Sequence, residues 1–145
     1  MQEILGFKKG SKIYEIRLLI CVAQADGYID EIEKECIFRQ VQQDLFSVKE
    51  RQIFHDDIEN PKDWKLLAQE VAPLINWSEK LYLIRKLFKL ASKDNLIQKE
   101  ETDMIYQIAR TIGIDQKKIK EIENWVIEGM NWSARWRNIV SQEKE

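Results

Sequence analysis

Apolar residues recur at three- and four-residue intervals along most of the chain, which is the spacing of one face of an α-helix. Ile13, Ile16, Leu19 and Ile20 follow this spacing near the start, and the same interval returns in every later apolar segment. No segment alternates apolar and polar residues for long enough to predict a β-strand. The pattern therefore predicts an all-α fold of seven or eight helices.

Residues that begin and end helices divide this pattern into elements. Two pairs, Asp30 with Glu33 and Ser47 with Glu50, have the spacing of a capping box. Gly113 is expected to end the sixth helix in the left-handed conformation. The expected helix starts are Ser11, Asp30, Ser47, Asn60 with Pro61 in the first helical position, Asn76 or Ser78, about Lys99, Asp115, and Ser133 for a short last segment.

The chain contains an internal repeat, in which residues 12–37 align with residues 80–105. The alignment needs no gap, and ten of its 26 positions are identical. The identical pairs are Lys12/Lys80, Tyr14/Tyr82, Ile16/Ile84, Arg17/Arg85, Leu19/Leu87, Ala23/Ala91, Asp26/Asp94, Ile29/Ile97, Glu33/Glu101 and Ile37/Ile105. We therefore expect a duplicated helix–turn–helix unit, with halves over about 11–60 and 79–130 packed about a pseudo-two-fold axis.

One turn of the repeat has an architectural explanation. Gly27 follows Asp26, and Asn95 stands at the equivalent place in the second copy. Gly and Asn are the residues that most readily adopt a positive φ, so this position is expected to end a helix. Ile29 and its counterpart are then expected to fill the corner between two helices.

Length and composition indicate one globular domain over residues 1–145. Hydrophobic residues make up 44% and charged residues 33% of the chain, too apolar for disorder. The net charge of −2 gives no basic field of the kind that draws in nucleic acid. No apolar run approaches the length of a transmembrane helix, and no signal-peptide layout is present, so we expect a cytoplasmic protein.

Few residues suit catalysis. The chain has one histidine, His55, and two cysteines, Cys21 and Cys36, whose spacing matches no zinc or redox motif. We expect both thiols to be buried and reduced and His55 to be solvated. No nucleophile–histidine pairing or phosphate-binding glycine loop is apparent, so the sequence does not indicate an enzyme.

At the repeat, the chain resembles the TerB-like (tellurite-resistance TerB) family. The likeness covers roughly residues 11–130 and rests on "ADGYIDEIE" after an apolar helix, with "ASKDNLIQKEE" as a degenerate second copy. That family is all-helical, with two related halves that each carry an A-x-x-D-G-x-I-x-x-x-E type turn. The resemblance implies a bacterial protein associated with resistance to tellurite and other stresses, whose acidic turns bind metal ions.

The acidic turns are the candidate site. The predicted metal-ligating residues are Asp26, Asp30, Glu33, Asp94 and Glu101. Such carboxylates could hold a divalent cation, Ca²⁺, Mg²⁺ or Zn²⁺, although the spacing is not that of an EF-hand. Two alternatives stay open. In one, the acids only cap helices and pair with Arg17 and Arg85; in the other, they form a docking surface for a basic partner.

The C-terminal segment over 131–145 is amphipathic. Trp132, Trp136, Ile139 and Val140 form one stripe, with Arg135 and Arg137 beside it. We expect this stripe to pack back on the core; the alternatives are a partner's groove or weak peripheral membrane contact through Trp132 and Trp136.

The sequence thus predicts a non-enzymatic, TerB-like accessory domain of a stress response. It would bind a protein partner, with or without a divalent ion, through its duplicated acidic turns. The alternative is a metal-free interaction scaffold in which those turns only cap helices.

Overall fold

The computed structural model describes residues 9–25, 27, 29–43, 46–92 and 99–142. Within these ranges the chain forms seven α-helices and one short 3-10 helix, with no strand, and the all-α prediction is confirmed. The elements are α1 (Lys9–Ala23), α2 (Glu31–Gln43), α3 (Val48–Glu59), α4 (Trp64–Val71), the 3-10 helix η1 (Ala72–Leu74), α5 (Trp77–Ala91), α6 (Lys99–Thr111) and α7 (Gln116–Ser141).

Most of the predicted caps are confirmed. Ser47 forms a capping box with Glu50 at the start of α3, and Asn76 forms another with Glu79 at the start of α5. Gly113 has a φ of +103° after α6, as expected of a residue that ends a helix. These motifs were readable because each depends on only a few consecutive residues.

Three predicted helix starts are wrong, and two of them lie before α5. Ser11 lies inside α1, buried, because α1 already runs from Lys9. Asn60 ends α3 instead of beginning α4: its backbone N–H donates to the carbonyl of Asp56. The α4 helix starts beyond Pro61, where the side chain of Asp63 accepts a hydrogen bond from the N–H of Lys65.

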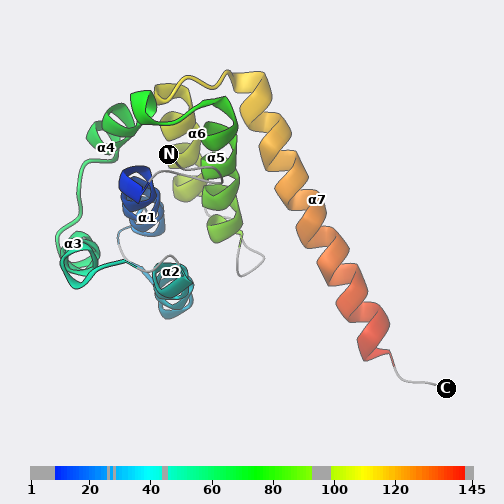
Figure 1. The fold of residues 1–145 in the computed structure, drawn as a ribbon. Helices are drawn as coiled ribbons and strands as arrows, with labels where there is room; N and C mark the ends of the chain where they lie inside the picture. The colour runs from blue at the N-terminus through cyan, green and yellow to red at the C-terminus, as the bar shows by residue number, and fades with distance from the viewer. Residues whose placement is uncertain (1–8, 26, 28, 44–45, 93–98, 143–145) are drawn as a thin grey trace.

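Helix α1 lies at the centre of the fold. It contacts each of the helices α2 to α6, which surround it in Figure 1. Its apolar residues are accordingly buried on every side of the helix, as is typical of a core helix. The buried apolar residues of α1 are Ile16, Leu18, Leu19, Ile20, Cys21, Val22 and Ala23.

The helix bounds are consistent with the proposed repeat. When the first copy is aligned on the second, the bounds of α1 and α2 coincide with those of α5 and α6, and the start of α3 coincides with that of α7. Helix α1 contacts α2 and α3, while α5 contacts α6 and α7. The common origin of the halves remains a prediction.

Helix α7 extends beyond the rest of the fold. Its N-terminal part packs on α5 and α6, and its C-terminal part projects away from the other helices (Figure 1). None of the helices described is long and apolar enough to span a membrane. Among the described residues, the second half of α7 has few neighbours outside its own helix, and these are Lys89 and Ser92 near the end of α5.

Candidate functional site

The first acidic turn caps α2. Oδ1 of Asp30 accepts a hydrogen bond from the N–H of Glu33 at 2.7 Å, and Oε1 of Glu33 accepts one from the N–H of Asp30 at 3.3 Å. Glu33 is buried. Just before this box, Gly27 has a φ of +108°, which confirms the predicted left-handed turn. Helix capping thus explains both Asp30 and Glu33.

The predicted metal set is only partly in view. Asp26 and Asp94 lie outside the described residues, as does Asn95, while Glu101 is buried in the first turn of α6. Among the residues that can be placed, no three or more His, Cys, Asp or Glu side chains gather closely enough to hold a metal ion. The divalent cation therefore stays a prediction from the sequence.

Arg17 makes an ion pair that the sequence analysis missed. Its Nε donates to Oδ2 of Asp57 at 2.8 Å, and a second guanidinium nitrogen donates to Oδ1 at 3.2 Å. This hydrogen bond raises the pKa of Arg17 above its usual value. Asp57 is buried and also lies 3.3 Å from Nζ of Lys62. The pair joins α1 to α3 and is structural.

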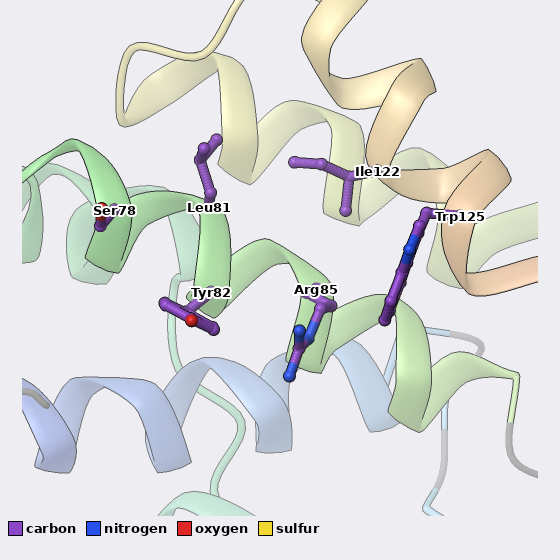
Figure 2. A pocket seen from close by; sticks show the side chains of 6 residues that line it. All are labelled: Ser78, Leu81, Tyr82, Arg85, Ile122 and Trp125. Atoms are coloured by element: carbon purple, nitrogen blue, oxygen red, sulfur yellow. The ribbon is translucent and has the colours of Figure 1, made fainter. Parts of the chain in front are cut away.

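Arg85 occupies the equivalent position in the second half and has a different partner. Its guanidinium carbon lies 5.1 Å from the centre of the Tyr82 ring and 5.2 Å from that of Trp125. Figure 2 shows the guanidinium between the two rings. A cation near two aromatic faces is stabilised electrostatically. The Nε of Arg85 is buried and has no hydrogen-bond partner among the residues that the structure describes.

The two arginine contacts are related by the internal repeat. Carried from the first copy to the second, Arg17 falls on Arg85 and Asp57 falls on Trp125. In the first half the arginine therefore binds a carboxylate, and in the second half an indole. The second arrangement leaves Trp125 more than half exposed on α7.

Two hollows flank Trp125 between α5 and α7, and we call them together the α5–α7 groove. The first, about 310 Å³, is shown in Figure 2 and is lined by Ser78, Leu81, Tyr82, Arg85, Ile122 and Trp125. The second, about 350 Å³, is lined by Lys89, Ser92, Trp125, Val126, Gly129, Met130, Ser133 and Arg137. The groove thus combines apolar walls with three cationic side chains.

The C-terminal stripe does not pack on the core, so that prediction is wrong. Helix α7 continues unbroken through Ser133, which opens no separate segment. We call residues 131–141 the α7 extension. Trp132 is 76% exposed and Trp136 64%, and Ile139 and Val140 are similarly open. The predicted amphipathic character holds, but its apolar side has no cover from the described chain.

The charge of the α7 extension is positive. Arg135 and Arg137 are both exposed, and no acidic residue occurs between positions 131 and 142. Glu128, also exposed, stands one turn before the extension begins. The extension is therefore a basic, tryptophan-bearing helix on a slightly acidic protein.

The two thiols and the histidine lie on three different helices, α1, α2 and α3. Cys21 is buried and Cys36 partly buried, and both are free. Burial raises the pKa of the Cys21 thiol to about 12, which keeps it protonated and unreactive at neutral pH. His55 is exposed on α3, as the sequence predicted, and its ring packs against that of Phe38.

The remaining buried acids have partners in the fold. Glu15, buried in α1, accepts a hydrogen bond from Nζ of Lys86 on α5 at 2.6 Å. Glu123 of α7 accepts one from the hydroxyl of Tyr106, whose pKa is raised mainly by burial. These contacts fasten α1 to α5 and α6 to α7, which fixes the base from which α7 projects.

Comparison with known proteins gives one match. The family model described as "Protein of unknown function (DUF533)" matches residues 10–126, which covers α1 to the middle of α7 and ends before the extension. No curated protein and no solved structure matches the chain.

Proposed function

We propose that this chain, which belongs to the DUF533 family, is a non-enzymatic binding module that engages a helical protein partner through α7. The observation that carries the proposal is the α7 extension. It presents Trp132, Trp136, Ile139 and Val140, each at least 60% exposed, on a helix continuous with the core. Contiguous exposed apolar residues of this kind mark interaction sites.

The composition of the surface supports a protein partner. Tryptophan and arginine are among the residues most enriched at the centres of protein interfaces, and the extension alternates them. The α5–α7 groove continues this surface toward the body of the fold, where Arg85 is already held between two rings. A partner would therefore meet a preorganised groove at one end and an open helix face at the other.

The TerB-like relationship is a further part of the proposal. It is supported by the all-helical fold, by helix bounds that recur between the two halves and by the left-handed Gly27 at the first acidic turn. With it come an accessory role in bacterial stress resistance, including resistance to tellurite, and a cytoplasmic location. These three properties stay predictions from the sequence resemblance.

The acidic turns have a smaller place in this function than the sequence suggested. Asp30 and Glu33 each bind the other's backbone N–H, so their capping accounts for both residues. A divalent cation at Asp26, Asp30, Glu33, Asp94 and Glu101 remains a prediction, to be tested by calorimetric titration with Ca²⁺, Mg²⁺ and Zn²⁺.

Site-specific photo-crosslinking in cells tests the binding function. A photoreactive phenylalanine derivative replaces Trp136 in one variant and Lys49, an exposed residue of α3, in a matched control. We expect a discrete covalent adduct from position 136 and none from position 49. If both positions give the same weak background, the α7 extension is not a docking surface and the proposed function is wrong.

A further inference from the structure

The apolar seam of α7 has the spacing of a coiled coil. Counting along the helix, intervals of three and four residues alternate without a break, as in a heptad repeat. We call these residues the α7 seam: Ile122, Trp125, Gly129, Trp132, Trp136 and Ile139. The first two line the α5–α7 groove (Figure 2), and the last three lie on the open extension.

A seam of this width suits another helix better than a membrane. Helices that lie on lipid present a broad apolar face and many basic residues opposite it. The α7 seam is narrow, and one of its flanks carries the charged residues Glu121, Glu128 and Arg135, which recur at heptad spacing along the helix. A single packed helix would cover it.

Gly129 interrupts the apolar seam, and no contact within the described monomer explains a glycine at this position. It lies in the middle of α7, where glycine is about 1 kcal/mol less favourable than alanine. Apart from the neighbouring backbone of α7, no described heavy atom would lie within 4 Å of a Cβ added at Gly129, so no close approach requires the glycine. The residue instead opens the second hollow of the α5–α7 groove, which also borders Lys89 and Arg137.

We propose that the α7 seam is covered by the α7 seam of a second copy of this chain, antiparallel and related by a two-fold axis. This inference rests on the proposed function and names its partner. With Gly129 set opposite Trp132 of the second copy, the indole enters the hollow that the glycine leaves. The same register sets Trp136 opposite Trp125, and Ile139 opposite Ile122, so large side chains of one copy lie against the α5–α7 groove of the other.

The charges of the seam favour this register. Glu128 and Arg135 stand on the same flank of the helix, each one residue before a seam position. In an antiparallel pair these flanks face each other, and Glu128 of one copy then meets Arg135 of the other, twice. A parallel pair would instead set Trp132 against Trp132, where the two indoles would clash, and Gly129 against Gly129, where a void would remain. The surface is self-complementary only in the antiparallel arrangement.

Sedimentation equilibrium of the full chain tests the proposal. We expect a reversible monomer–dimer equilibrium between about 1 μM and about 500 μM. Trp136→Glu places a charge in the seam and is expected to leave only monomer. Gly129→Leu fills the hollow that receives Trp132, and we expect the dissociation constant to rise about tenfold or more.

A charge-reversal cycle tests the register itself. Glu128→Arg and Arg135→Glu are both at exposed positions, so each variant is expected to fold, as circular dichroism can verify. Each single change sets like charges together twice and should raise the dissociation constant about tenfold at low salt. The double variant restores both pairs, and its dissociation constant should return to within about threefold of the original.

Three results would overturn the inference. The first is a chain that stays monomeric at every concentration. The second is a double variant whose dissociation constant is as high as that of the single variants. The third is a monomer that binds anionic vesicles through Trp136 in a flotation experiment. A monomer that still forms a photo-adduct with another protein at position 136 would refute the second copy as partner and leave the binding function intact. Absence of both dimer and adduct would refute both proposals.

Discussion

At the scale of single residues, Gly27 and Gly129 have different backbone conformations, so glycine affects stability differently at the two positions. Neither glycine has a described heavy atom within 4 Å of a Cβ built on it, so neither is required for lack of space. Gly27 has a φ of +108°, a conformation that side chains other than glycine rarely adopt. Gly129 is helical, and there a side chain would strengthen the helix.

The two glycines therefore predict opposite effects of the same substitution. Gly27→Ala should lower the free energy of unfolding by about 1–2 kcal/mol because alanine is strained at positive φ. Gly129→Ala should raise the intrinsic stability of α7 by up to about 1 kcal/mol. Chemical denaturation followed by circular dichroism, at a concentration where the chain is monomeric, measures both. Equal effects of the two changes would contradict the conformational argument.

The arginines show which residue contacts could not be read from the sequence. One alternative open from the sequence was that Arg17 and Arg85 pair with Asp26 and Asp94, which lie outside the described residues. The contacts that the structure describes are with Asp57 on α3 and Trp125 on α7. Sequence periodicity reports which side of a helix is apolar, but it does not say which helix lies against that side. The different partners of two identical arginines therefore became visible only with α3 and α7 in place.

At the scale of elements, the sequence predicted helices best where local chemistry decides. The two predicted capping boxes, at the starts of α2 and α3, each involve residues three positions apart, and both are present. The predicted break at Ser133 failed because serine is tolerated inside an exposed helix, and no proline or positive-φ glycine follows it within α7. Whether a helix end packs on the core depends on where its neighbours end, and α5 ends at Ala91, too early to cover the extension.

Removing the last element tests this account of α7. Deletion of residues 131–145 should leave the melting temperature of the monomer within about 2 °C, because the α7 extension has almost no buried side chain. The far-ultraviolet helical signal should fall by the share of about three helical turns. A collapse of the melting temperature would show that the extension packs on the core after all.

At the scale of the whole molecule, the part of the chain that the structure describes forms a central helix enclosed by five others and a seventh that projects from them (Figure 1). The partly buried pairs Glu15–Lys86 and Arg17–Asp57 tie this body together, while α7 packs on the body mainly through its first half. The proposed interaction surface begins where α7 leaves the other helices. The sequence resemblance rests on the acidic turns, which lie within the residues that the family model matches. That match stops at residue 126, before the α7 extension, so it gives no information about the extension.

Hydrogen exchange of the α7 extension tests the central claim most directly. A helix of about three turns with few contacts to the other described helices is marginal in water, so its amides should exchange rapidly in dilute protein. Amides of α5 in the core should exchange slowly under the same conditions. When the protein concentration is raised, exchange over residues 131–141 should slow markedly while α5 is unchanged, because the seam is then covered. Protection of the extension equal to that of α5 in dilute protein would show that this surface is not open for docking, and would contradict the account.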